Sequence, residues 1–290
     1  MREPQSGAVG VVDPAVAGPV LAEAAKRRWK ITHILNTHHH GDHVGGNLEI
    51  KKATGCTIVG PRVDRARIPG IDVEVDDGDH YRFGEAEAEV FFVPGHTSGH
   101  VAYAFREQRA LFCGDTLFAL GCGKMFEGTP QQFWTSLARL RALPDDMRIY
   151  CAHEYTQSNA RFAVTVEADN KTLLDRSAAV DAARSRGEAT VPSLLGEEKA
   201  TNPFLRADVP AVQRAVGMMG GDPVKVFAEV RHRKDVFRQG PNGSRHAITV
   251  IPSAARDLSC GLKGPSTCGL GMTGCVDSYR ALSQRRTRQK

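Results

Sequence analysis

The stretch Thr37-His38-His39-His40-Gly41-Asp42-His43 decides how this chain folds and which chemistry it carries. It follows the alternating apolar stretch 31–36, which predicts a strand, and it precedes residues 44–53, which predict the start of a helix. The histidines and the aspartate are therefore expected on a loop between a strand and a helix. At such a loop a rigid scaffold presents side chains to solvent.

Four side chains of this loop can bind a metal ion: His38, His40, Asp42 and His43. Neutral imidazoles and a carboxylate suit Zn²⁺ or another first-row metal. The ligands are too many for one structural zinc, and no pair of cysteines lies nearby, so we expect a hydrolytic site with two metals. His39 lies between two residues that share a direction, and we expect it to point elsewhere.

Length and composition describe an ordinary globular chain. Its 290 residues allow one large domain or two smaller ones, and 41% of them are hydrophobic. No apolar run reaches the ~20 residues that span a bilayer, and residues 1–7 lack the apolar region of a secretory signal. The seven cysteines fit no disulfide scaffold, so a cytoplasmic, reducing location is expected.

The formal net charge of +5 does not predict nucleic-acid binding. The basic residues are spread along the chain, and no recognised nucleic-acid module accompanies them.

Three more potential ligands follow predicted strands, just as the first group does. His96 comes after the stretch 88–93, Asp115 after 110–113, and His153 after 148–151. A lone histidine or aspartate at a strand end is usually a turn or cap residue. Its recurrence after four strands favours metal binding, because five histidines and two aspartates can satisfy two metals, with one carboxylate between them.

The order of predicted elements divides the chain into three parts. Up to residue 156, helices alternate with strands, which predicts a layered sandwich of mixed α and β structure. Residues 157–239 are mostly helical and are expected to form a second, small domain. Residues 240–290 are rich in glycine turns and are expected to be a disordered tail.

Several motifs resemble those of a known family. The stretch at 37–43, Pro94-Gly95-His96-Thr97-Ser98-Gly99-His100 and Phe112-Cys113-Gly114-Asp115-Thr116-Leu117 are similar to signatures of the metallo-β-lactamase superfamily. Within that superfamily, the segments 121–128, 151–156, 192–198, 202–206 and 231–235 resemble glyoxalase II, the hydroxyacylglutathione hydrolases. The resemblance covers roughly residues 8–238. It implies an α+β fold, an αββα sandwich followed by a small α-helical domain.

The resemblance also assigns the metal ligands. It implies one metal held by His38, His40 and His96, and a second held by Asp42, His43 and His153, with Asp115 bridging the two. Asp42 and Asp115 are the expected catalytic residues. The implied cofactor is a pair of divalent ions, with zinc as the first choice and iron or manganese as alternatives.

The implied activity is hydrolysis of the thioester S-D-lactoylglutathione to D-lactate and glutathione by a hydroxide that bridges the metals, the second step of methylglyoxal detoxification. The implied glutathione pocket uses Lys124, Tyr155, Arg231 and Lys234. Cations there suit the two carboxylates of glutathione. A thiol with a pKa of ~8.5 is a good leaving group as thiolate. A monomer without membrane or nucleic-acid partners is expected.

The chain departs from the family pattern in three places. It starts about one hairpin late, which predicts an open sheet edge and makes the mitochondrion an alternative location. Phe126 stands where the family usually has a tyrosine, so one hydrogen bond worth ~0.5–1.5 kcal/mol is expected to be missing. Residues after Gly240 have no family counterpart.

Three alternative functions are a persulfide dioxygenase with one iron, a lactonase, and a truncated paralogue with little activity. The seven ligands argue against a site with a single iron. Arg231 and Lys234 argue against a lactonase. The complete ligand set argues against a decayed paralogue.

Overall fold

The N-terminal strands of the protein form a parallel sheet. The computed structural model describes residues 1–238. Parallel neighbours need a crossover between them, and helices supply the first two crossovers of this sheet. The strands lie in the order β1 (Gly10–Val12), β2 (His33–Leu35), β3 (Thr57–Pro61) and β4 (Val73–Val75), with α1 (Ala17–Lys26), then α2 (Gly41–Val44) and α3 (Asn47–Thr54), in the crossovers.

The second sheet is larger and mostly antiparallel. Its one parallel pair, β8 with β11, is joined by a long connection that contains α4 (Pro130–Arg141). The six strands lie in the order β12 (Ser193–Leu194), β11 (Arg148–Cys151), β8 (Ala110–Gly114), β7 (Val101–Phe105), β6 (Ala86–Phe92) and β5 (His80–Phe83).

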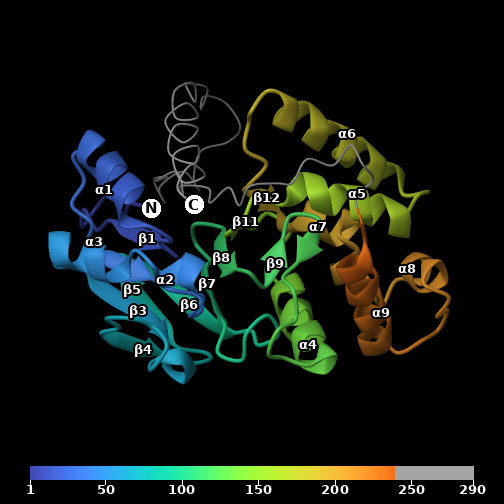
Figure 1. Ribbon diagram of the computed structural model, residues 1–290, viewed down its shortest axis with the longest axis horizontal. Helices are drawn as coiled ribbons and strands as arrows, with labels where there is room; N and C mark the ends of the chain where they lie inside the picture. Colours follow the sequence, from blue (N-terminus) through green and yellow to red (C-terminus); the bar gives the residue numbers. More distant parts are fainter. Residues whose placement is uncertain (239–290) are drawn as a thin grey trace, which may run out of the picture.

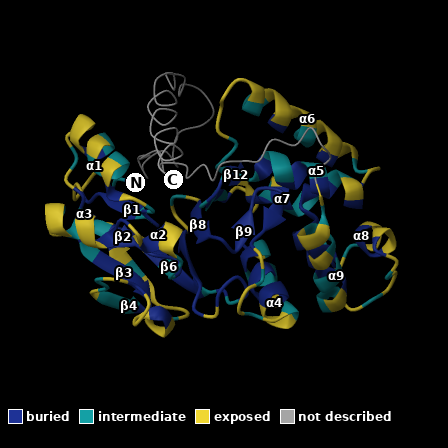
Figure 2. Cartoon of the chain, in the orientation of Figure 1, coloured by how far each residue is buried: buried dark blue, intermediate teal, exposed yellow. Residues whose placement is uncertain are grey.

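Three hydrophobic clusters define four layers (Figures 1 and 2). One cluster, which includes Ile34 and Ile58, packs α1 and α3 against the outer face of the parallel sheet. A second, which includes Val59 and Tyr103, fills the space between the two sheets. The third covers the outer face of the larger sheet with α4 and the later helices. The predicted αββα sandwich is confirmed.

The later helices pack directly on this sandwich. They are α5 (Thr156–Val166), α6 (Lys171–Ser185), α7 (Leu195–Thr201), α8 (Pro210–Ala215) and α9 (Pro223–Val236). Phe162 and Phe227 from these helices belong to the same hydrophobic cluster as Phe133 of α4 and Ile149 of β11. Since one core continues across residue 156, the boundary between the first two domains stays a prediction. The expected tail, 240–290, lies outside the described residues.

The structure adds short elements that the sequence pattern did not predict. The additional strands have only two or three residues, which is too short to show an alternating apolar pattern. Helix α2 also begins before the predicted helix start at Val44, so Asp42 and His43 lie on a helical turn and not on a loop. The additional elements are β4, β9 (Leu117–Phe118), β10 (Gly121–Cys122), β12, α7 and the 3₁₀ turns Arg62–Asp64 and Pro203–Leu205.

Strand β1 lies at the edge of its sheet, as expected, but the first residues turn back and cover part of that edge. Arg2 and Val9 form an antiparallel bridge. The backbone nitrogen of Gly10 donates to the carbonyl oxygen of Met1 at 3.0 Å. The edge is therefore partly covered. Within the described part of the chain, no helix is both long and apolar enough to cross a membrane.

One hydrogen bond ties the two sheets together just before the histidine-rich stretch. The hydroxyl of Tyr103, fully buried on β7, donates to the backbone oxygen of Asn36 at 2.9 Å. We predict that Tyr103→Phe lowers the free energy of unfolding by about 1 kcal/mol, since a buried carbonyl loses its donor. Urea denaturation measures this loss. Tyr81→Phe on the edge strand β5, where the ring is only half-buried, is the control and should lose less; equal losses contradict the prediction.

Candidate metal centre

Three imidazoles from two loops meet at one point. His38 and His40 follow β2, and His96 follows β6. The Nδ1 atom of His40 lies 3.1 Å from Nε2 of His38 and 3.1 Å from Nε2 of His96. Three ring nitrogens that face one another so closely form a group that could hold a metal ion.

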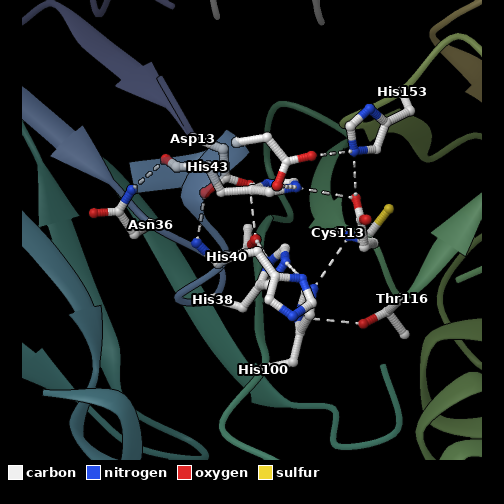
Figure 3. Close-up of polar contacts among 12 residues, drawn as sticks. Asp13, Asn36, His38, His40, His43, His100, Cys113, Thr116 and His153 are labelled. Carbon is white, nitrogen blue, oxygen red and sulfur yellow. Dashed lines mark hydrogen bonds and ion pairs between the residues drawn. The ribbon is translucent and has the colours of Figure 1, made fainter. Parts of the chain in front are cut away.

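A second group lies beside the first and combines Asp42 and His43 of α2 with His153, which follows β11. Nε2 of His43 lies 3.9 Å from Asp42 Oδ1, and Nε2 of His153 lies 3.6 Å from Asp42 Oδ2. Figure 3 shows His43 and His153 directed toward a common region, with His38 and His40 adjacent to it.

Asp115, which follows β8, lies between the two groups. Its Oδ2 atom is 3.4 Å from Nε2 of His96, in the first group. Its Oδ1 atom is 3.5 Å from Nε2 of His43 and 3.4 Å from Nε2 of His153, in the second group. The structure thus brings all seven predicted ligands together, and each oxygen of one carboxylate faces a different group.

The chemistry of these donors fits two cations. Burial, followed by the neighbouring His43, holds the pKa of His38 well below its usual value, and burial also lowers the pKa of His40 and His96. These rings are therefore neutral, as metal ligands must be. His43 Nε2 and Asp115 Oδ1 are buried without a hydrogen-bond partner, a costly state that a bound cation would relieve.

The second group attracts positive charge. Burial alone lowers the pKa of His43, but the carboxylates of Asp115 and Asp13 outweigh it and raise the pKa to about 9. Burial raises the pKa of Asp115, but the neighbouring His153 ring and the charge of His43 hold it below its usual value. A carboxylate that stays ionised inside the protein needs a cation beside it, which a proton on His43 or a metal ion can supply.

Asp13 is a functional residue that the sequence interpretation missed. It follows β1 at a positive φ of 49°, and it belongs to a third possible ligand group with His38 and His43. Its oxygens are already occupied: they accept from the backbone nitrogen and the hydroxyl of Thr37 at 2.7 Å each and from Nδ1 of His43 at 3.1 Å. Asp13 therefore orients His43, leaving Nε2 for a metal. Its place directly after a strand was the available signal.

Two neighbouring histidines have separate partners. His100 stacks on His38 with ring centroids 4.5 Å apart, and its Nε2 accepts from the backbone nitrogen of Asp115 at 3.1 Å. It therefore supports two ligands. His39 points away from the centre, with Nδ1 2.9 Å from the buried carboxylate of Asp64, which confirms the expectation that it points elsewhere.

Two family models match consecutive parts of the chain. The model of the metallo-beta-lactamase superfamily matches residues 4–153, and the model of the hydroxyacylglutathione hydrolase C-terminus matches residues 154–237. The chain belongs to the hydroxyacylglutathione hydrolase family of the metallo-β-lactamase superfamily.

Curated relatives and a solved structure agree with this membership. The chain is 61% identical over 238 residues to a hydroxyacylglutathione hydrolase of Methylococcus capsulatus, covering 82% of this chain and 93% of the relative. It is 56% identical over 232 residues to one of Rhodospirillum rubrum, covering 80% and 91%. The crystal structure of ETHE1 from Myxococcus xanthus has a TM-score of 0.56 at 23% identity, covering 90% of this chain and 92% of that one, and shows the shared fold.

The predicted substrate residues of this family member lie in two places. Tyr155 stacks on His153, with ring centroids 4.8 Å apart, and the backbone oxygen of Lys124 accepts from His96 Nδ1 at 2.7 Å. Both therefore border the metal centre. Arg231 is buried and donates to Cys122 and Asp235, and Lys234 donates to the backbone oxygen of Ser158.

We predict that Asp115→Ala removes metal from the protein, because it deletes the one side chain that faces both ligand groups. Metal analysis after dialysis should find less than one ion per chain in the variant and two in the parent. The control is Glu167→Gln. It alters another buried carboxylate, which forms an ion pair with Arg206 and is not one of the candidate ligands. Two ions per chain in Asp115→Ala would contradict the bridging position.

A pH effect on stability is expected from Lys234. Burial, and then the charge of Arg231, lower its pKa from 10.5 to about 8. Between pH 8 and 10.5 the unfolded chain keeps a proton that the folded chain has lost, so the free energy of unfolding should rise with pH in this window.

Denaturation at several pH values measures that rise. Lys234→Met should flatten it, whereas Lys171→Met, which replaces an exposed lysine of α6, should leave it unchanged. The same slope in Lys234→Met and in the parent would show that Lys234 titrates normally.

Proposed function

We propose that the protein hydrolyses thioesters of glutathione with 2-hydroxy acids, S-D-lactoylglutathione first among them, to a hydroxy acid such as D-lactate and free glutathione. The observation that carries this proposal is the position of Asp115, whose two oxygens face two separate ligand groups. The name of the relatives supports the substrate class, because the match extends over the helical region as well as the sandwich.

We assign His38, His40 and His96 to one divalent ion, and Asp42, His43 and His153 to a second, with Asp115 between them. Zinc is the first choice, because imidazole and carboxylate ligands suit it, and iron or manganese can occupy the same ligands. Bound ions supply an activated water at neutral pH and polarise the carbonyl group of the substrate.

The protein's own residues supply orientation. Asp115 is held by the hydrogen bond from its backbone nitrogen to His100, and His43 is held by Asp13. The Asp42 side chain is 44% exposed, against 9% for Asp115, so it lies on the open side of the centre. As a carboxylate it can accept a hydrogen bond from an attacking water and direct the oxygen lone pair at the thioester.

Recognition of glutathione is assigned to the four cationic or aromatic residues predicted for it. Lys124 is exposed at the mouth of the centre and suits a carboxylate, while Tyr155 lies against His153 and can donate its hydroxyl. Arg231 and Lys234 contribute positive charge from α9, where Arg231 contacts the backbone of Cys122. The thiolate of glutathione leaves readily, since its conjugate thiol has a pKa of ~8.5.

For the cellular compartment and the oligomeric state, we retain the predictions made from the sequence. The cysteines of the described chain, Cys56, Cys113, Cys122 and Cys151, are free and buried, which supports a reducing compartment such as the cytoplasm. The monomeric state is a prediction that sedimentation or size exclusion can check.

The experiment that tests this function combines thioester hydrolysis with metal analysis on one preparation. Release of free thiol from S-D-lactoylglutathione should accompany two metal ions per chain. Lactones and glutathione persulfide, offered to the same preparation, should turn over far more slowly. Two ions per chain without thioester turnover would overturn the function and leave the metal centre standing.

Phe126 provides a sharper test of the glutathione pocket. Its ring is 59% exposed and lies edge-on to His40 and His96, with centroids 5.8 and 5.3 Å away. Phe126→Tyr adds a hydroxyl at the mouth, and one extra hydrogen bond should lower KM roughly 2–10-fold with little change in kcat. Phe126→Leu keeps the position apolar and should not lower KM. An unchanged KM in Phe126→Tyr contradicts the assignment.

A further inference from the structure

The segment 118–123 connects two parts of the candidate site. It follows the bridging candidate Asp115 and precedes Lys124, and it contains the end of β9 and all of β10. Leu120 has a left-handed φ of 57°, which costs free energy for a residue other than glycine. The segment is therefore held in a conformation that contacts from outside must stabilise.

Side chains of the helical region supply those contacts; Figure 1 shows α5, α7 and α9 on the same side of the molecule as β9. Asn202 donates to the oxygens of Phe118 at 3.2 Å and Gly121 at 2.9 Å. Asn159 of α5 donates to the oxygen of Ala119 at 3.1 Å.

The remaining contacts are ionic side chains on the same backbone. Glu198 of α7 accepts from the nitrogen of Leu120 at 2.8 Å. Arg231 of α9 donates to the oxygens of Cys122 at 3.1 Å and Gly123 at 3.4 Å. We refer to Asn159, Glu198, Asn202 and Arg231 as the backbone clamp.

The clamp is buried and held in turn by further partners. Glu198 and Asn202 are fully buried, and Glu198 is paired with Arg176 and bonded to Asn202 at 3.2 Å. Arg231 is paired with Asp235 at 2.9 Å and lies over the ring of Phe204. Hydrogen bonds of this kind are strong in a dry interior and costly to leave unmade.

The clamped segment touches the candidate ligands directly. The nitrogen of Gly123 donates to the oxygen of Thr116 at 3.4 Å. A Cβ atom on Gly123 would lie 2.0 Å from the backbone oxygen of Asp115 and 2.9 Å from Nδ1 of His96. Because there is no free space on this side of Gly123, a shift of the segment toward the metal centre must displace Asp115 or His96.

We propose that the helical region positions the metal centre: the backbone clamp fixes residues 118–123 and thereby the places of Asp115 and His96. Asn159, Glu198, Asn202 and Arg231 are positioning residues in this account. For Arg231 this is a role in addition to any contact with glutathione. The inference rests on the metal centre of the proposed function, but not on the identity of the substrate.

The test compares two buried amides of the full-length protein. Asn202→Ala removes the donors to Phe118 and Gly121. Gln213→Ala, the matched control, removes a buried amide that bonds Ala207, Gly220 and Gly221 in the helical region, away from the clamped segment. Each metal-free protein is titrated with Co²⁺, whose visible absorption reports ligand geometry, and the free energy of unfolding is measured beside it.

We expect Asn202→Ala to bind Co²⁺ about tenfold more weakly than the parent, with altered visible bands, as is typical when an outer contact to a metal site is lost. Gln213→Ala should lose comparable stability and keep the parent's Co²⁺ affinity and spectrum. Parental affinity and spectrum in Asn202→Ala overturn the proposal, and so does an equal loss of affinity in Gln213→Ala.

Asn159→Ala, which removes the single bond to Ala119, serves if Asn202→Ala does not fold. It should shift Co²⁺ affinity in the same direction by a smaller factor, and an unshifted value overturns the proposal. Co²⁺ binding is measured without substrate. If the parent protein binds two ions but does not hydrolyse the thioester, the proposed function is contradicted and the clamp proposal is unaffected. A parent that binds no Co²⁺ overturns the clamp together with the metal centre.

Discussion

The structure depends on one buried carboxylate that faces two groups of imidazoles. Asp115 cannot be shared in this way unless four separate strand ends deliver their side chains to one place. Both oxygens lie within 3.5 Å of ring nitrogens, and Oδ1 has no hydrogen-bond partner. Such an arrangement is costly without a cation, so the surrounding fold must over-determine it.

The two sheets and the helical region each contribute to that constraint. The parallel sheet ends in Asp13 and in the stretch with His38 and His40, and Tyr103 ties this sheet to the other one. The larger sheet delivers Asp115 and His153. The helical region forms hydrogen bonds with the backbone that follows Asp115. The region that the family resemblance associates with glutathione therefore also lies in direct contact with the segment that follows the candidate ligand Asp115.

The sequence predicted those parts that have a strong local signal. The strands predicted at 110–113 and 148–151 occur as β8 and β11. The recurrence of histidine and aspartate after strands selected the seven ligand candidates, and the structure brings their side chains together. The strand-end rule would also have selected Asp13, which directly follows β1 but was not among the predicted ligands.

Other features depend on contacts between distant residues and leave no local signal. Nothing near Asn202 shows that its amide will bond the backbone of Phe118 and Gly121, 84 and 81 residues earlier. The burial of Arg231 is equally invisible, since its helix position alone is compatible with a solvated surface. The covered edge of β1 depends on a turn at residues 4–7 that the strand pattern does not reveal.

A crystal structure of the protein with bound metal, with anomalous diffraction recorded at the absorption edge, tests the central claim most directly. The account predicts two anomalous peaks about 3.5–4 Å apart, the separation of two-metal hydrolytic sites, with one oxygen of Asp115 bound at each peak. A single peak, or two peaks with both oxygens of Asp115 on the same ion, would contradict it.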